Sequence, residues 1–111
     1  MSEAINNLIK NEITQNDICL FMKGTPDAPQ CGFSMAISNM LKILEVKFKS
    51  INVLENEELR QRLKVFSDWP TIPQLYIKGE FLGGCDIVKE MYESGELQKK
   101  LSEKSINYNK K

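Results

Sequence analysis

Apolar residues along the chain follow two periods, which predict helices alternating with buried strands. A helical period opens the chain, and its apolar positions are Ile5, Leu8, Ile9 and Ile13. The polar pair Asn16-Asp17 ends this pattern, and the continuous apolar run 18–22 that follows predicts a buried strand. After a turn-rich loop the helical period returns and predicts a second helix. The apolar residues on its expected buried face are Phe33, Ile37, Met40, Leu41 and Leu44.

The second half of the chain predicts shorter elements. Residues 47–53 are predicted as a second strand, although their apolar and polar positions alternate imperfectly. A third helix carries Leu59, Leu63 and Phe66 and ends at Ser67-Asp-Trp-Pro70. Segments 74–77 and 80–82 flank Lys78-Gly79 and predict a tight hairpin. A fourth helix follows, and Gly95 separates it from a weak last helix that carries Leu97 and Leu101. The expected core face of the fourth helix consists of Ile87, Val88, Met91 and Tyr92.

This order of elements predicts an α/β fold, a single thioredoxin-like domain. A right-handed crossover makes the first two strands parallel, and the hairpin adds two antiparallel strands to the same sheet. The result is a four-stranded mixed sheet with helices on both faces. A chain of 111 residues is long enough for one core and too short for two. We therefore expect one domain over residues 1–111, with an ordered core of about 5–105 and a frayed tail over 106–111.

Composition narrows the expected partners and compartment. Fifteen basic and fifteen acidic side chains give a formal net charge of zero, so nothing steers the chain toward nucleic acid or an anionic membrane. No apolar run approaches the length of a transmembrane helix. The first residues have neither the apolar core of a secretory signal nor the arginines of a transit peptide. We therefore expect a cytoplasmic protein.

Sulfur is the expected centre of any chemistry, because the chain has three cysteines and no histidine. An odd number of widely spaced cysteines does not favour a disulfide framework. Cys19 lies inside the apolar run 18–22 and is predicted as a core residue without a function. Cys31 opens the second helix, where free N–H groups favour an anion and lower the pKa of a thiol. Taken alone, this position also suits a cysteine that packs as a small apolar residue.

The segment Cys31-Gly-Phe-Ser34 resembles the active site of the monothiol glutaredoxins. Three further blocks agree with that family in order and spacing, and the resemblance runs from about residue 5 to residue 105. They are Lys23-Gly-Thr25 with its longer loop to Cys31, Trp69-Pro-Thr-Ile-Pro73, and Gly83-Gly-Cys-Asp86. Dithiol relatives carry Cys-Pro-Tyr-Cys at this place, whereas Ser34 cannot complete an internal disulfide. The second sulfur must come from elsewhere, and glutathione is the abundant candidate.

The resemblance implies a glutathione site beside Cys31. In the family, the lysine at position 23 approaches the glycine carboxylate of glutathione, and the arginine at position 60 pairs with the same carboxylate. Ile72 offers its backbone to an incoming peptide, and Pro73 forms a cis bond with it. Without the family, a solvated surface role for Lys23 and Arg60 and an ordinary loop proline remain open.

The same resemblance places the γ-glutamyl group of glutathione at the start of the fourth helix. Gly83-Gly84 permits close backbone approach, and helix N-terminal amides suit a carboxylate. Asp86 would pair with the α-amino group of the ligand, or would cap the helix. Cys85 is a buried apolar residue, a backbone contact to glutathione, or a second thiol that forms a disulfide with Cys31. We favour the backbone contact.

A [2Fe–2S] cluster needs four terminal ligands, and one cysteine per chain cannot supply them. Two copies of Cys31 and two glutathione thiolates can, so the ligand count predicts a homodimer bridged by the cluster. The resemblance implies the same arrangement, transfer of clusters between an assembly scaffold and recipient proteins, and BolA-like partners. The rival interpretation is a glutathione-dependent thiol-disulfide oxidoreductase, in which Cys31 attacks a protein–glutathione mixed disulfide. A third is a redox sensor, in which a disulfide with Cys85 prevents cluster binding.

Overall fold

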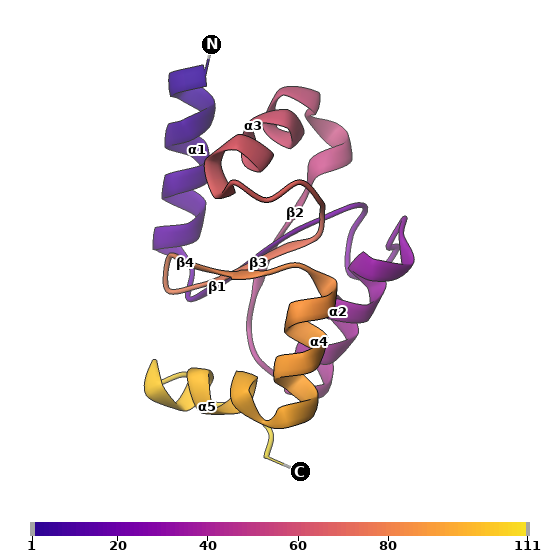
Figure 1. Cartoon of the computed structure of the whole chain (residues 1–111), viewed down its shortest axis with the longest axis vertical. Coiled ribbons are helices and arrows are strands. Elements are labelled where there is room, and N and C mark those ends of the chain that lie inside the picture. The colour runs from indigo at the N-terminus through magenta and orange to yellow at the C-terminus, as the bar shows by residue number, and fades with distance from the viewer. Residues whose placement is uncertain (1, 111) are drawn as a thin grey trace.

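A mixed sheet separates two layers of helices in the computed structural model, which describes residues 2–110 (Figure 1). The strands in this part of the chain are β1 (Ile18–Met22), β2 (Lys49–Asn52), β3 (Gln74–Ile77) and β4 (Glu80–Gly83). Their order in the sheet is β2-β1-β3-β4. Strand β1 runs parallel to β2 and antiparallel to β3, which is antiparallel to β4. The predicted thioredoxin-like topology is confirmed.

Helices cover both faces of the sheet. The helices are α1 (Ser2–Gln15), α2 (Gly32–Ile43), α3 (Glu57–Ser67), α4 (Cys85–Ser94) and α5 (Glu96–Glu103), with a short 3₁₀-helix η1 (Val53–Glu55). Figure 1 shows α1 and α3 on one side of the strands and α2, α4 and α5 on the other. In the described residues 2–110, no helix is both long enough and apolar enough to cross a bilayer.

Strand β1 serves both hydrophobic cores because successive side chains on a strand point to opposite faces. Ile18, Leu20 and Met22 join the core that α2, α4 and α5 complete. Cys19 and Phe21 join the core beneath α1 and α3. Burial, with a smaller effect of nearby Glu12, raises the pKa of the Cys19 thiol to about 12. The thiol is therefore protonated and inert, which confirms the prediction of a core residue.

The predicted hairpin and the break between the last two helices are both confirmed. Lys78 and Gly79 connect β3 to β4 with φ values of 51° and 81°. Two consecutive left-handed residues form the tight turn that matches the twist of paired strands. Gly95 ends α4 in the same left-handed region, with φ of 86°.

Three apolar residues that the helical period assigned to buried faces are exposed. Phe33 is 62% exposed, and Leu8 and Ile87 are each 38% exposed. Both Phe33 and Ile87 lie in the first turns of their helices, α2 and α4, and Phe33 lines a groove rather than packing over the sheet. Leu8 lies beside the stripe through which α1 packs, formed by Ile9 and Ile13. Periodicity identifies the direction of a face but not the point along the helix at which its partner layer ends.

The second strand is shorter than predicted. The sequence predicts a strand over 47–53, whereas β2 spans Lys49–Asn52. Val53 begins η1 instead, because the Asn52 side chain accepts the N–H of Leu54 and turns the backbone out of the sheet.

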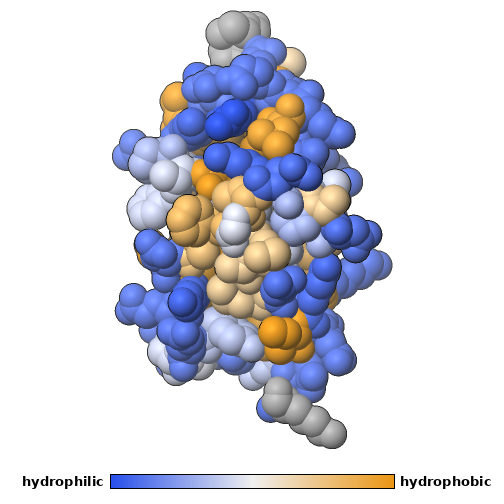
Figure 2. Space-filling view, turned by 90° about the vertical axis from the view of Figure 1, so that its right-hand side faces the viewer, coloured by the Kyte–Doolittle hydropathy of each residue, from blue (hydrophilic) through white to orange (hydrophobic). Residues whose placement is uncertain are grey.

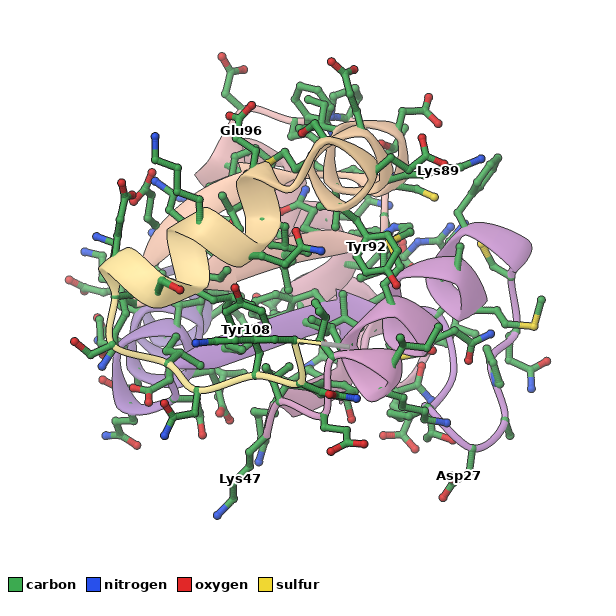
Figure 3. All side chains as sticks on the ribbon, turned by 90° about the horizontal axis from the view of Figure 1, so that it is seen from below. Asp27, Lys47, Lys89, Tyr92, Glu96 and Tyr108 are labelled. Carbon is green, nitrogen blue, oxygen red and sulfur yellow. The ribbon has the colours of Figure 1, made fainter. Side chains whose placement is uncertain are left out.

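The prediction of a frayed tail is wrong for residues 106–109. Ile106 and Tyr108 pack against the core that contains α2 and α5. The N–H of Asn109 donates to the carbonyl of Leu44 at the C-terminal end of α2, over 2.6 Å. Figure 3 shows Tyr108 on the segment that returns from α5 toward α2. Two partly buried apolar side chains therefore hold a segment whose polar neighbours suggested disorder.

Candidate functional site

A groove of about 410 Å³ opens near the N-terminal end of α2. Every residue predicted to bind glutathione lines it, together with Phe33, Lys64 and the turn 69–71. The predicted residues are Lys23, Arg60, Ile72, Pro73, Gly84, Cys85 and Asp86. Figure 2 shows the side of the molecule on which α2 and α4 begin, with an apolar area framed by hydrophilic residues. Five separate segments of the chain thus meet at one concave site.

Cys31 is the N-cap residue of α2, and its free thiol is partly exposed. Cys31 is not itself among the lining residues, but it lies at the edge of the groove: Phe33, two residues later, lines it, and Cys31 interacts electrostatically with the lining residues Lys23 and Cys85. Partial burial has the largest single effect and opposes ionisation of the thiol, whereas hydrogen bonds from the backbone N–H groups of Ser34 and Phe33 favour it. The Ser34 hydroxyl and the charge of Lys23 act in the same direction. The pKa of Cys31 is therefore lowered, as a helix start favours.

Ser34 connects the cysteine helix to the end of β1. Its side chain is fully buried, and its hydroxyl oxygen accepts the N–H of Lys23 over 3.0 Å. The carbonyl of Lys23 in turn accepts the N–H of Gln30 over 2.9 Å, which closes the base of the loop between them. The residue that replaces a second cysteine therefore fixes the position of Lys23 relative to Cys31.

The opposite wall of the groove is the segment that enters β3. The Ile72–Pro73 bond is cis, which confirms the prediction. Gln74 is fully buried, and its amide nitrogen donates to the carbonyls of Trp69 and Thr71 over 3.3 and 3.2 Å. This role could not be predicted from the sequence, since a glutamine at the start of an apolar strand gives no indication of the backbone groups that it will bind.

The start of α4 forms the floor of the groove. Gly84 is the N-cap residue, so Asp86 is not a cap and lies in the first turn. A Cβ atom at Gly84 would lie 2.9 Å from Nε1 of Trp69, so only glycine allows the indole to pack this closely. Burial raises the pKa of Cys85, and the charges of Asp86 and Cys31 raise it further. Cys85 is thus a weaker nucleophile than Cys31 at neutral pH.

Helix α3 supplies the remaining cations. Arg60 lies 3.8 Å from Glu57 through its guanidinium, and its buried Nε has no hydrogen-bond partner within residues 2–110. Lys64 lines the same groove one helical turn later. Sequence reasoning missed Lys64, although the spacing of four residues from Arg60 places both on one helix face.

Comparisons with known proteins agree with this geometry. A family model described as Glutaredoxin matches residues 18–82. The chain belongs to the glutaredoxin family. It is 58% identical over 102 residues to the probable monothiol glutaredoxin 2 of Rickettsia felis, covering 91% of this chain and 98% of that protein. With Ser34 at the fourth position of the motif, it is a monothiol glutaredoxin, and the resemblance found in the sequence is confirmed.

Solved structures of glutaredoxins share the fold over most of the chain. A monomeric truncated mutant of Trypanosoma brucei 1-C-Grx1 is 43% identical, with a TM-score of 0.85 over 93% of this chain and 94% of that one. Reduced poplar apo GrxS14 is 54% identical, with a TM-score of 0.80 over 89% of this chain and 91% of that one.

The opposite pKa shifts of the two accessible thiols predict selective alkylation of this glutaredoxin. At neutral pH, iodoacetamide should modify Cys31 at least about tenfold faster than Cys85, because only the thiolate reacts. As pH rises, the rate at Cys31 should reach its plateau below the pH at which Cys85 does. Peptide mass mapping over a pH series measures both rates in one sample. Cys31→Ser should lose the fast phase, and faster labelling of Cys85 at neutral pH would contradict the assignment.

Proposed function

We propose that this monothiol glutaredoxin binds glutathione in the groove and, as a pair of chains, holds a [2Fe–2S] cluster that it passes on during iron–sulfur cluster assembly. The observation that carries the proposal is the thiol of Cys31, which is partly exposed, lowered in pKa and placed at the edge of a groove with charges of both signs. The three cysteines of the protein are all free thiols, and free thiols persist in a reducing compartment. The compartment that we propose is therefore the cytoplasm.

The groove matches glutathione in size and in charge. Its volume of about 410 Å³ is that of a small-molecule site. Lys23 and Arg60 supply cations for the glycine carboxylate, and the backbone of Ile72 supplies hydrogen-bonding groups for the cysteinyl part. The amides at the start of α4 suit the γ-glutamyl carboxylate, and Asp86 suits the α-amino group. Lys64 adds a third cation to a site that would receive a ligand of net negative charge.

The cluster is the cargo of this protein, and two chains share it. Each iron binds two bridging sulfides and two further ligands, so the cluster requires four thiolates. Within residues 2–110 no group of three or more cysteine, histidine or acidic side chains could hold a metal ion. Two Cys31 thiolates and two glutathione thiolates would supply the set, with the lowered pKa favouring the thiolate form that binds iron.

The surface around Cys31 supports association with a second chain. Phe33 and Met35, in the first turn of α2, are 62% and 47% exposed. An apolar area of this kind beside a shared ligand suits a second copy or a BolA-like partner that brings ligands of its own. Half of the sulfur ligands are exchangeable glutathione, so a recipient protein can displace them without unfolding either chain.

Anaerobic reconstitution tests the proposal. The protein is incubated with iron, sulfide and glutathione, and its visible absorption and mass are then measured. The wild type should become a coloured dimer only when glutathione is present, whereas Cys31→Ser should remain a colourless monomer. Cys85→Ser is the matched control, because it removes a neighbouring thiol that the proposal does not use as a ligand. A coloured Cys31→Ser protein would refute the assignment.

The lowered pKa of Cys31 also supports a second candidate, a glutathione-dependent oxidoreductase. The Cys31 thiolate would attack the glutathione sulfur of a protein mixed disulfide and release the protein thiolate. A second glutathione thiolate would then attack the bound glutathione, producing glutathione disulfide and restoring Cys31. A wild type that stays colourless in the reconstitution but turns over a glutathionylated peptide rapidly would favour this enzyme over the cluster carrier. An oxidised chain with a Cys31–Cys85 disulfide that loses its cluster would favour a redox sensor.

A further inference from the structure

The two backbone N–H groups that follow β1 both donate to side chains rather than to the sheet. The N–H of Lys23 donates to the buried hydroxyl of Ser34, over 3.0 Å. The N–H of Gly24 donates to Oδ1 of Asn52, over 2.9 Å. The segment that carries Lys23 is therefore held from two sides, by the cysteine helix α2 and by the end of β2.

Asn52 uses the same oxygen for a second purpose. It is the last residue of β2 and is paired with Met22, the last residue of β1. Its Oδ1 also accepts the N–H of Leu54 over 3.0 Å and so caps the start of η1. A carbonyl oxygen has two lone pairs, so one amide oxygen can hold both donors.

The segment capped by Asn52 leads directly to Arg60. Asn56 donates its N–H to the carbonyl of Val53 in η1, and its own carbonyl accepts the N–H of Arg60 over 3.0 Å. The Asn56 side chain caps α3 by accepting the N–H of Leu59. A short chain of hydrogen bonds therefore connects the Asn52 amide to the helix that presents Arg60 to the groove.

We propose that Asn52 is a positioning residue for the glycine carboxylate of glutathione: its shared oxygen fixes the spacing between Lys23 and Arg60, the two cations that bind this carboxylate. The inference rests on the proposed function and extends it to a residue that does not line the groove. The affinity for a carboxylate that accepts hydrogen bonds from two cations at once depends on the distance between those cations. The affinity of a single cation for a carboxylate has no such dependence. Removing Oδ1 of Asn52 breaks the hydrogen bond to the Gly24 N–H, next to Lys23, and the hydrogen bond to the Leu54 N–H in η1, which leads to Arg60.

A comparison of two ligands separates positioning from general stability. Glutathione and γ-glutamylcysteine carry the same number of carboxylates, but in the dipeptide the C-terminal carboxylate is on the cysteine, one residue short of the position of the glycine carboxylate. Their affinities for the reduced protein can be measured by amide chemical-shift titration in NMR, which also reports the Gly24 N–H directly. The wild type should bind glutathione about tenfold more tightly than the dipeptide, because only the carboxylate on the glycine extends far enough to meet both cations.

Asn52→Ala should reduce this preference by about fivefold, while affinity for the dipeptide changes by less than about twofold. Asn52→Asp retains an oxygen with two lone pairs and should keep both the preference and the chemical shift of the Gly24 N–H close to those of the wild type. Asn16→Ala is the matched control. It also removes an asparagine side chain that forms two hydrogen bonds, here to Glu12 of α1, but Asn16 precedes the start of β1 and Lys23 follows its end. It should leave the preference unchanged.

Each other outcome overturns the inference in a recognisable way. If Asn52→Ala keeps the wild-type preference, or weakens both ligands equally, Asn52 is a structural cap and the glutathione site stands. If the wild type itself shows no preference, the roles of Lys23 and Arg60 in the proposed function fail and the inference fails with them. Asn52→Ser, whose short side chain cannot reach both N–H groups, replaces the alanine variant if that variant does not fold.

Discussion

Gly24→Ala is expected to destabilise the protein by about 3 kcal/mol and to weaken glutathione binding more than about tenfold. Gly24 has φ of +89°, a conformation that residues with a Cβ adopt only with strain. A Cβ atom here would also lie 2.5 Å from the carbonyl oxygen of Ala28 and 2.7 Å from the nitrogen of Gln30. Both obstacles are backbone atoms, so the base of the loop must open. Opening it displaces Lys23 and Cys31 together.

Gly95→Ala is the control that separates conformational strain from collision. Gly95 has nearly the same φ, +86°, and a Cβ there would meet no atom within 4 Å. This variant should lose about 1 kcal/mol and bind glutathione as the wild type does. Urea denaturation and the NMR titration measure the two effects. Equal losses of stability in the two variants would show that the loop accommodates a Cβ atom at Gly24 at no additional free-energy cost. That result would contradict the predicted effect of the backbone collisions.

Gln74→Leu should be the second severe substitution, with a loss of about 3 kcal/mol and a weakened glutathione site. The buried amide of Gln74 holds the carbonyls of Trp69 and Thr71, and its oxygen accepts the hydroxyl of Tyr76 over 3.1 Å. A leucine of similar size leaves all three groups without this partner. The segment before the cis-proline would then lose its attachment to β3, and that segment is one wall of the groove.

Tyr76→Phe is the matched variant for this network. It removes only the hydroxyl that donates to Gln74, so a loss of about 1 kcal/mol and unchanged glutathione binding are expected. Urea denaturation gives the two stabilities, and the NMR titration gives the two affinities. If Gln74→Leu proves as mild as Tyr76→Phe, the turn keeps its shape without the amide, and the network does not position the wall.

The parts of this glutaredoxin that local pattern controls could be predicted from its sequence. Strand β1 has an apolar residue at every position, and the turn Lys78-Gly79 has a single favoured geometry, so both followed from composition and spacing. The position of Cys31 at a helix start also followed, because the helical period begins there. These features depend on residues close in sequence, for which propensities and turn chemistry are informative.

Features that depend on distant partners could not be predicted. Gln74 and Asn52 act through backbone groups that folding alone brings within reach, and no spacing reveals such contacts. Phe33 fits the helical stripe, yet it is exposed because the helix begins at the groove mouth. Ile106 and Tyr108 lie in a polar tail, and their partial burial depends on contacts with the core that α2 and α5 help to form. The local sequence therefore predicts each helix and strand better than it predicts which other parts of the chain that element contacts.

The anchoring of the tail at Leu44 determines where this protein can be immobilised. Helix α2 has Cys31 at one end and the tail contact at Leu44 at the other, thirteen residues or about 20 Å away. An affinity handle joined beyond the tail would therefore emerge at the end of α2 opposite the thiol. A sensor chip coupled through such a handle would leave the sulfur facing the bulk solution, open to large partner proteins.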